Sequence, residues 1–296
     1  AAMMLTRLLL DAGVPSGVAQ FITGSGREVG DWLAHTENVD CVSFTGSTAV
    51  GRQLMQGGAH NLQHVFLELG GNDPYVVFED ADMDVAVAEA VGGRCYNAGQ
   101  TCCANKRFII QNSVKEEFTN KLIEALKKHR IGDPASEDTQ MGCLVSERAA
   151  AEVMRLIEKT VQQGGKVLYG GTSHGAFVDP TVIEVTKDMD VAKDMEIFGP
   201  VFPIMGFDTF EQAVEISNQT MYGLASGVIT QNINTAIQFA NAVQAGTCVI
   251  NSSGNYRSVH QPFGGYKQTG IGREGTSHTL YEVTQEKTIV IKNVLK

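Results

Sequence analysis

Two side chains in the first half of the chain have the chemistry of a nucleophile and of a general base. Cys102 lies in a loop of small and polar residues, NAGQTCCANK (97–106), where the backbone can approach a ligand closely. Glu68 ends an apolar run and is followed by Gly70 and Gly71. Partial removal of its carboxyl group from water would raise its pKa towards the range of a general base. Taken singly, each also fits a role without chemistry, as an inert buried cysteine and as an edge carboxylate in solvent.

Six cysteines are distributed along the chain, and only Cys102 and Cys103 are adjacent. None stands in a C-x-x-C pattern or in a cysteine–histidine pattern with the spacing of metal ligands. The sequence therefore predicts neither a disulfide framework nor a metal site, and it favours a reducing, cytoplasmic setting. We assign no role to Cys103. The remaining cysteines lie in apolar segments or ordinary loops and are expected to be inert: Cys41, Cys95, Cys143 and Cys248.

Two glycine-containing turns could bind a phosphate group. TGSGREVG (23–30) has the spacing G-x-G-x-x-x-G, one residue longer than the dinucleotide fingerprint, and this favours a plain turn between a strand and a helix. FTGSTAVG (44–51) is the better candidate because Gly46 ends a predicted strand, while Ser47 and Gly51 enter a helix. The free N–H groups and the dipole at such a helix start suit a pyrophosphate. A purely structural turn explains this stretch equally well.

The length and charge of the chain narrow the function further. A chain of 296 residues predicts two domains. Its net charge of −10 disfavours partners such as nucleic acid or an anionic membrane surface. No apolar run approaches the ~18–20 residues that a membrane-spanning helix needs. The first residue is not Met, and the pattern of a secretory signal is absent, so we expect further residues upstream.

Short apolar runs alternate with amphipathic segments along the chain. The predicted strands cover residues 18–24, 39–44, 64–71, 107–111, 180–185, 202–207, 226–230 and 247–251. The predicted helices cover residues 4–10, 27–35, 48–59, 80–97, 114–129, 148–163, 209–217 and 234–243. This alternation indicates parallel sheets with right-handed crossovers in two α/β domains. The tail over 284–294 alternates like an exposed strand that needs a partner edge, which a second subunit could supply.

Five motifs carry a resemblance to a known family. They are FTGSTAVG (44–51), LELGG (67–71), NAGQTC (97–102), EIFGP (196–200) and PFGGYKQTGIGRE (262–274). By the order and spacing of these motifs the chain closely resembles the NAD(P)-dependent aldehyde dehydrogenase superfamily over nearly its whole length. One such string is weak evidence, whereas five in register outweigh the non-catalytic interpretations of single residues.

The resemblance implies an α/β fold made of an incomplete Rossmann-like cofactor domain and an α/β catalytic domain. We expect the C-terminal part of the dinucleotide-binding domain at 1–70, the catalytic domain at 71–275 and an oligomerisation strand within 276–296 of a homodimer or homotetramer. Family members are longer, and we expect the missing part to be N-terminal. That part carries the family's oxyanion-binding Asn and the Lys and Glu that hold the adenosine ribose.

By position, Cys102 matches the family's nucleophile and Glu68 its general base. The resemblance implies that the parent protein oxidises an aldehyde to a carboxylic acid with NAD or NADP, through a thiohemiacetal and then a thioester on Cys102. Glu68 would deprotonate the water that releases the acid. Two alternatives are a CoA-acylating relative and a catalytically silent nucleotide-binding protein. Glu68 argues against the first, because such relatives often dispense with the base, and an inert Cys102 would indicate the second.

The resemblance also implies a set of cofactor contacts, each of which has an ordinary structural explanation when its residue is considered alone. Gly46, Ser47 and Gly51 match the family's pyrophosphate turn, and Leu69 lies where the family makes a backbone contact to the nicotinamide amide. Glu196 matches the family residue that holds the nicotinamide ribose, and Phe198 matches the one packed near the ring.

The loop NSSGNYRSVHQPFGG (251–265) helps to select the aldehyde in this family. Arg257 could pair with an anion at the far end of the substrate, or it could be an exposed loop arginine. Tyr96 stands where succinate-semialdehyde dehydrogenases commonly carry an anion-binding Arg, which weakens that particular substrate. Phe263 is a third candidate substrate residue. The motifs are most similar to the semialdehyde branch, and oxidation of aliphatic or hydroxy-aldehydes is the alternative.

Overall fold

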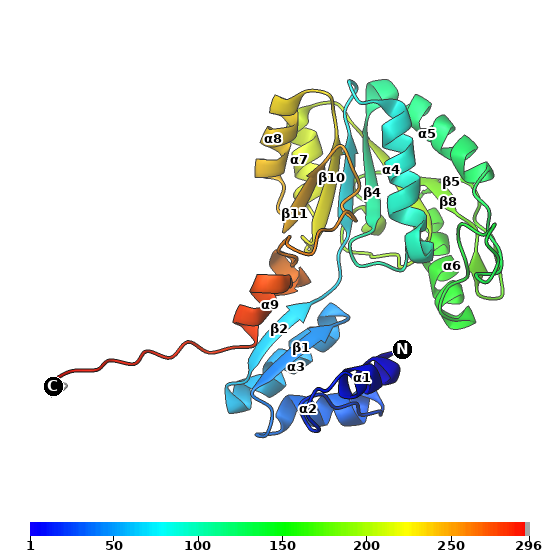
Figure 1. Ribbon diagram of the computed structural model, residues 1–296. Helices are drawn as coiled ribbons and strands as arrows, with labels where there is room; N and C mark the ends of the chain where they lie inside the picture. Colours follow the sequence, from blue (N-terminus) through cyan, green and yellow to red (C-terminus); the bar gives the residue numbers. More distant parts are fainter. Residues whose placement is uncertain (294–296) are drawn as a thin grey trace. The chain divides into compact units, whose positions relative to one another are not determined.

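The computed structural model describes residues 1–293, and Figure 1 shows their helices and strands. The chain forms two compact units. The first consists of residues Ala1–Ser43 and Arg52–Val65, and the second consists of Phe44–Gly51 and the chain from Phe66 onward. Every residue that the sequence assigns to a site therefore belongs to the second unit. The predicted domain boundaries fall elsewhere, at 70/71 and 275/276, and remain predictions.

The first unit is mainly helical. It contains α1 (Ala2–Asp11), a π-helical turn (Gly26–Gly30) that continues into α2 (Asp31–His35), and most of α3 (Thr48–Asn61). The strands β1 (Cys41–Thr45) and β2 (His64–Glu68) each begin in this unit and end in the other. The Ser25 hydroxyl caps the π-helical turn by accepting the Glu28 N–H at 3.2 Å.

The predicted strand over residues 18–24 is wrong. Val18 and Ala19 lie in a turn and a bend, and residues 20–24 have no regular structure. The side chains of Val18, Phe21 and Ile22 are exposed. An apolar run becomes a strand only where a neighbouring strand takes up its backbone hydrogen bonds, and sequence pattern alone does not supply that neighbour.

A seven-stranded sheet is the centre of the second unit. In order, its strands are β11 (Thr247–Ile250), β10 (Ala225–Ile229), β3 (Asp73–Val77), β4 (Asn105–Gln111), β9 (Val201–Phe207), β8 (Thr181–Glu184) and β5 (Lys166–Tyr169). Neighbouring strands are parallel except β5, which is antiparallel to β8. This sheet confirms the predicted α/β class, and the interior of the unit lies between the sheet and its helices.

Helices cover both faces of this sheet. The helices α4 (Met83–Cys95) and α5 (Asn112–Lys127) lie on one face, and α7 (Phe210–Asn218) and α8 (Ile233–Ala242) lie on the other (Figure 1). The helix α6 (Glu147–Gln162) packs beside the hairpin of β6 (Ser173–His174) and β7 (Phe177–Val178). Side-chain caps fix where four of these helices begin: Asp82, Ser146, Thr209 and Asn232.

The sequence pattern misses β3, although it is the third strand from one edge and fully buried. Its second residue is Pro74, and a proline argues against an interior strand because it cannot donate a backbone hydrogen bond. The structure accommodates Pro74 at the strand's beginning, where the register with β4 shifts between Asp73 and Pro74. Pro74, which has no backbone N–H to donate, therefore lies where the pairing of β3 with β4 is irregular.

Three predicted motifs enter neighbouring strands from the same edge of the sheet. LELGG (67–71) leads into β3, NAGQTC (97–102) leads into β4, and EIFGP (196–200) leads into β9. Because β3, β4 and β9 are consecutive and parallel, their amino ends lie side by side. The topology therefore brings together three segments that are far apart in the sequence.

Two further parts of the second unit matter for the site. The end of β2 pairs antiparallel with β12 (Gly270–Ile271), with Glu68 opposite Gly270. After α9 (Thr276–Glu282), residues 284–293 have no regular secondary structure (Figure 1), and residue 294 lies outside the described residues. The predicted segment 276–296 therefore begins with a helix, and its role in oligomerisation remains a prediction. In residues 1–293, every helix is too short or too polar to cross a bilayer.

Candidate active site

Cys102 is presented by a tight left-handed turn at the end of α4. Asn97, Ala98 and Gly99 have φ angles of 51°, 53° and 75°, a conformation that costs energy in residues with a Cβ atom. Two reciprocal hydrogen bonds of 3.0 Å, between the side-chain amides and backbone carbonyls of Asn97 and Gln100, hold the turn. A strained turn that is held in this way gives the loop after it one defined path.

Glycines allow this loop to pack against its neighbours. A Cβ atom on Gly99 would collide with the carbonyl oxygen of Gly199, which belongs to the EIFGP segment. A Cβ atom on Gly71 would lie 2.8 Å from the carbonyl oxygen of Cys102. Three motifs therefore touch one another through backbone contacts that only glycine permits.

The Cys102 thiol is partly exposed, and its pKa lies below the usual value for a cysteine. A hydrogen bond from the Cys103 thiol, the positive charge of Lys106 and a hydrogen bond from the Cys103 backbone N–H lower this pKa. Burial and the negative charge of Glu196 act in the opposite direction, and burial is the larger of these two. The pKa values of the buried Cys95 and Cys248 are instead raised, to about 12 and about 11, chiefly by burial. Cys102 is therefore predisposed to react as a thiolate.

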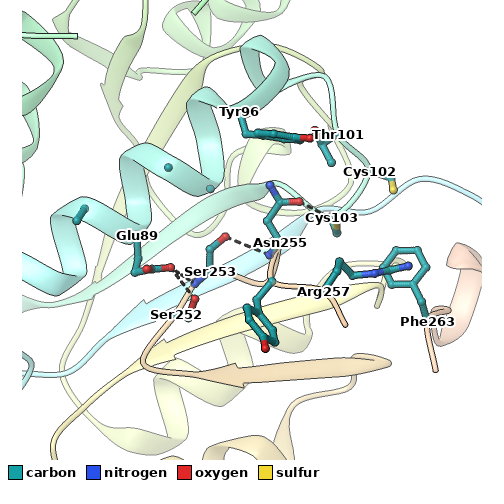
Figure 2. Close-up of a pocket in the computed structure, with 14 residues that line it drawn as sticks. Glu89, Tyr96, Thr101, Cys102, Cys103, Ser252, Ser253, Asn255, Arg257 and Phe263 are labelled. Carbon is teal, nitrogen blue, oxygen red and sulfur yellow. Dashed lines mark hydrogen bonds between the residues drawn. The ribbon is translucent and has the colours of Figure 1, made fainter. Parts of the chain in front are cut away.

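Cys103 links the nucleophile loop, residues 97–106, to the loop over 251–265. Its sulfur lies 3.1 Å from Asn255 Oδ1, as Figure 2 shows. A thiol has one hydrogen, so while Cys103 donates to Asn255 it cannot also donate to Cys102. In that state, Lys106 and the Cys103 backbone N–H are the groups that hold the Cys102 pKa down. The sequence assigns no role to Cys103, and this contact gives it one in the structure.

Glu89 of α4 anchors the same loop. One of its carboxylate oxygens accepts hydrogen bonds from Ser252 Oγ at 2.6 Å and from the Ser253 N–H at 2.9 Å (Figure 2). Ser253 Oγ in turn donates to Asn105 Oδ1 at 3.1 Å. These bonds tie the loop to both α4 and β4. Glu89 is missed by the sequence analysis because nothing in the pattern of α4 distinguishes it from a solvent-facing carboxylate.

Glu68 ends β2 and is only 4% exposed. Its Oε2 atom is buried without a hydrogen-bond partner. Burial raises the pKa of Glu68 to about 8, with further increases from the negative charges of Glu274 and Cys102 and partial offsets from Arg273 and Arg257. The carboxyl group is thus close enough to Cys102 for their charges to interact. Such a group changes protonation state near neutral pH, as a general base must.

Cys102 lines a cavity of about 660 Å³. The predicted substrate residues Tyr96, Arg257 and Phe263 line the same cavity, and Figure 2 shows them around the nucleophile. The Arg257 guanidinium lies over the Phe263 ring, 3.1 Å from its centroid. Glu68 is not among the residues that line this space. The structure thus brings the three predicted substrate residues together with the nucleophile in one cavity, which Glu68 does not line.

A second cavity, of about 770 Å³, is lined by Glu196 and Phe198. Phe198 is 45% exposed, and Glu196 is partly buried. Glu196 Oε1 accepts from Lys106 Nζ at 3.1 Å and from the Gly71 N–H at 3.4 Å. Glu196 Oε2 lies beside Gly70, where a Cβ atom would approach to 2.6 Å. Glu196 and Phe198, the two residues predicted to contact the nicotinamide end of a dinucleotide, therefore line the same cavity.

Lys106 is a site residue that the sequence analysis does not identify. Its side chain is 1% exposed, and its ammonium group donates to the carbonyl oxygens of Thr101 at 3.1 Å and Cys102 at 2.5 Å in addition to Glu196. The signal that could have found it is a charged pair, Lys106 and Arg107, at the start of an apolar strand, because buried charges must be paired. Arg107 donates to backbone carbonyls, including Asn72 and Ile216 at 2.6 Å.

The predicted phosphate-binding turn, residues 44–51, also makes contacts that stabilise the fold. The Gly46 N–H donates to the Glu68 carbonyl oxygen at 3.0 Å, and Ser47 Oγ accepts from the Val50 N–H at 3.4 Å. Gly51 is required by packing, since a Cβ atom there would lie 2.6 Å from a methyl carbon of Leu69. The Leu69 N–H is taken by the Thr269 carbonyl at 2.7 Å. Gly46 and Ser47 remain exposed at the start of α3, so a phosphate could still reach them.

The residues present fit the nicotinamide end of a dinucleotide. Glu196 Oε1 is held by Lys106 and Gly71, while Oε2 makes no hydrogen bond with the described residues and is not fully buried. It is therefore free to accept a hydrogen bond from a ribose hydroxyl. The exposed Phe198 ring offers a flat apolar surface beside it.

Comparison with known proteins agrees with this arrangement. The family model of the aldehyde dehydrogenase family matches residues 1–289. The chain is 43% identical to an aldehyde dehydrogenase of Emericella nidulans, over 97% of this chain and 59% of that protein. It is 38% identical to a lactaldehyde dehydrogenase of Methanococcus maripaludis, over 98% and 62% of the two chains.

Solved structures give the same result. Betaine aldehyde dehydrogenase of Staphylococcus aureus, in complex with NAD+, superposes with a TM-score of 0.92 at 36% identity, over 95% of this chain and 57% of that one. Glyceraldehyde-3-phosphate dehydrogenase GapN of Methanocaldococcus jannaschii, complexed with NADP, has a TM-score of 0.93 at 36% identity, over 99% and 63%. The chain thus spans about three-fifths of the length of these relatives.

Proposed function

The chain belongs to the aldehyde dehydrogenase family, and from this premise we propose that the protein oxidises an aldehyde to a carboxylic acid with NAD or NADP, using Cys102 as nucleophile and Glu68 as general base. The single observation that carries the proposal is the state of Cys102. It is a partly exposed thiol with a lowered pKa on the wall of a cavity, and its charge interacts with that of a buried carboxyl group.

In the first half of the reaction the Cys102 thiolate attacks the aldehyde carbon. A C–S bond forms, and the carbonyl π electrons move onto oxygen to give a thiohemiacetal anion. The left-handed turn at Asn97–Gly99 fixes the loop, so the sulfur is oriented before the substrate arrives. Loss of a hydride from this carbon gives the thioester, and NAD or NADP, when bound, would supply the acceptor for that hydride.

In the second half, water cleaves the thioester. Glu68 takes a proton from the water, the water oxygen bonds to the acyl carbon, and Cys102 leaves as a thiolate. The pKa of Glu68, raised to about 8 by burial, makes it a stronger base than an exposed glutamate once it is ionised. Glu68 does not line the substrate cavity, so this step requires a water molecule between its carboxyl group and the acyl carbon.

For the cofactor, we propose that Glu196 accepts a hydrogen bond from the nicotinamide ribose and that Phe198 packs beside the ring. Gly46 and Ser47, at the start of α3, would bind the pyrophosphate, and Gly51 would permit the close packing behind them. The Leu69 N–H is occupied by Thr269, so only its carbonyl oxygen is left to contact the nicotinamide amide.

For the substrate, we propose a small aldehyde with a polar or anionic far end, such as a semialdehyde. Arg257 supports this choice, because its guanidinium lines the nucleophile's cavity and no ion pair of it is found among residues 1–293. Tyr96, at the cavity wall, offers a hydroxyl group in addition. The names of the relatives favour small oxygenated aldehydes, since lactaldehyde is a hydroxy-aldehyde and glyceraldehyde-3-phosphate also carries an anion.

We further propose that the protein acts in the cytoplasm as a homodimer or homotetramer. The exposed side chains of Ile289, Val290 and Ile291 support the assembly, because an apolar tail segment of this kind suits pairing with a second subunit.

The test is production of NADH or NADPH by the full-length protein across a panel of aldehydes, repeated with Cys102→Ala. We expect turnover by the wild type and none by the variant. Labelling with a thiol reagent gives an independent check, because Cys102 should be modified faster than the other five cysteines. Equal labelling of all six, together with no turnover, would contradict the proposal.

A further inference from the structure

Lys106 is the one lysine among the buried charged residues of the described chain, and the mechanism above does not use it. A buried ammonium group is costly unless it is paired and all its N–H groups are bonded. Lys106 meets this condition with three acceptors: the carbonyl oxygens of Thr101 and Cys102, and Glu196 Oε1. Two of these acceptors belong to the nucleophile loop, and the third is the carboxylate expected to bind the nicotinamide ribose.

The placement follows from the fold. Lys106 is the second residue of β4, and Arg107 beside it points to the opposite face of the strand. Arg107 is bonded to backbone carbonyls of Asn72, Ala192, Ile216 and Ser217. Lys106 therefore reaches the loops that enter β4 and β9, at the shared amino edge of the sheet. Its Nζ also lies 5.8 Å from the centroid of the Phe198 ring.

We propose that Lys106 is a positioning residue that joins the two halves of the active site, by holding the backbone of the nucleophile loop and the cofactor carboxylate Glu196 in one arrangement while its charge stabilises the Cys102 thiolate. This inference rests on the proposed function for the meaning of Glu196. The contacts of Lys106 with Cys102 and Glu196 do not depend on it.

The charges around the Cys102 thiol determine in which direction its pKa should change when Lys106 is replaced. Lys106 favours the thiolate, whereas Glu196 opposes it. Asp73 and Glu68 are the other carboxyl groups that interact with Cys102. Replacing Lys106 by a neutral residue removes the one positive charge that lowers the pKa of Cys102 and leaves these carboxyl groups in place. Cys102 should therefore become harder to ionise, and Glu196 should lose its charged partner and keep only the Gly71 N–H.

The experiment measures the rate at which iodoacetamide alkylates Cys102 as a function of pH, followed by tandem mass spectrometry so that Cys102 and Cys103 are distinguished. It uses the full-length protein, with Lys106→Met and Lys106→Gln. Glutamine retains a hydrogen-bond donor for the Cys102 carbonyl but has no charge. The matched control is Lys115→Gln, which removes another lysine–glutamate pair, of 2.8 Å with Glu184, on a helix and strand elsewhere in the sheet.

We expect the midpoint of alkylation to move upward by about 1 pH unit in both Lys106 variants and to stay unchanged in the control. Affinity for NAD or NADP, measured by calorimetry, should fall about tenfold in both variants, which corresponds to the loss of one charge-assisted contact. Wild-type midpoints and affinities in folded variants would overturn the proposal. If Lys106→Met does not fold, Lys106→Gln decides, and failure of both to fold would show that Lys106 is structural rather than positioning.

Failure of the inference about Lys106 can be distinguished from failure of the proposed function. Alkylation requires neither an aldehyde nor turnover. If the wild type reduces neither NAD nor NADP with any aldehyde while the alkylation midpoint still moves in the Lys106 variants, the proposed function is wrong and the effect of Lys106 on the thiol stands. If turnover is normal and the midpoint does not move, only the inference about Lys106 is wrong.

Discussion

The guanidinium carbon of Arg257 lies 3.1 Å from the centroid of the Phe263 ring, on the wall of the cavity that contains Cys102. The aromatic face fixes the plane of the guanidinium without using its N–H groups. Those donors are left to meet a substrate, and a planar guanidinium binds a carboxylate or phosphate with two parallel hydrogen bonds. The pair thus provides an oriented cation on the wall of the cavity that the nucleophile also lines.

Replacing this cation should change which aldehydes are used. In Arg257→Gln we expect the KM for an aldehyde with an anionic far end to rise roughly 10–100-fold, with a smaller effect on kcat, because a charge-assisted hydrogen bond contributes about 1.5–3 kcal/mol. The KM for a neutral aldehyde of the same length should change little. Steady-state kinetics with such a matched pair measures the difference.

Arg155→Gln is the control for this change, since Arg155 is an exposed arginine of α6 that pairs with Glu152 at 2.6 Å. It should leave both substrates unaffected. A loss in Arg257→Gln that is equal for the anionic and the neutral aldehyde would mean that Arg257 supports the shape of the loop and does not bind the substrate.

The burial of Glu68 predicts a rising pH dependence of turnover. A general base must be ionised, and burial raises the pKa of Glu68 to about 8. At pH 7 only a minor fraction of the enzyme carries the ionised base, so kcat should increase with pH and level off above about pH 8. In Glu68→Gln the acyl enzyme should accumulate, giving a burst of one NADH or NADPH per site followed by a slow phase. Stopped-flow absorbance detects this burst, and an unchanged steady rate would contradict the role of Glu68.

The burial of Glu68 also predicts that the free energy of unfolding falls as pH rises, whereas turnover increases. The folded state favours the neutral form of Glu68. The contribution of this group to the free energy of unfolding is therefore fully present below its ordinary pKa of 4.5 and is lost as the pH rises towards about 8. Glu68→Gln removes an ionisable group from the buried position. Its melting temperature should therefore exceed that of the wild type at pH 9 and differ little at pH 5. Glu116→Gln, at an exposed position of α5, should match the wild type at both.

The sequence identifies the motifs that converge in the structure, and these motifs immediately precede strands. LELGG, NAGQTC and EIFGP each contain glycine, which marks the close backbone contacts that Gly71, Gly99 and Gly199 make in the structure. Their convergence could not be read from the chain, because it depends on the adjacency of β3, β4 and β9. The strand β3 itself was not predictable from the pattern, since Pro74 is an exception to the pattern of an interior strand.

Residues that act through contacts distant in the sequence were also missed. Lys106 stands inside the quoted loop NAGQTCCANK, yet its role depends on Glu196, which is 90 positions away. Glu89 is similar, because its partners Ser252 and Ser253 come from a loop far along the chain. Periodicity reports which face of an element is buried, and it does not report which polar groups meet there.

Two adjacent glycines of α4 provide the last prediction, in which one substitution serves as the control for the other. A Cβ atom on Gly92 would meet no atom within 4 Å, whereas one on Gly93 would collide with Ser253 Oγ and lie 2.6 Å from Asn105 Nδ2. Because alanine is favoured over glycine inside a helix by roughly 1 kcal/mol, Gly92→Ala should raise the free energy of unfolding by about that amount.

Gly93→Ala should instead lower the free energy of unfolding, since its methyl group displaces Ser253 from Asn105 and so disturbs the loop that Glu89 anchors. Its effect on KM for the aldehyde should exceed that of Gly92→Ala, because the displaced loop carries Asn255 and Arg257. Urea denaturation and steady-state kinetics of the two variants measure both differences. Equal stability of the two would mean that the loop is free to move away from α4, and the fixed position of Arg257 over Phe263 would then no longer explain substrate choice.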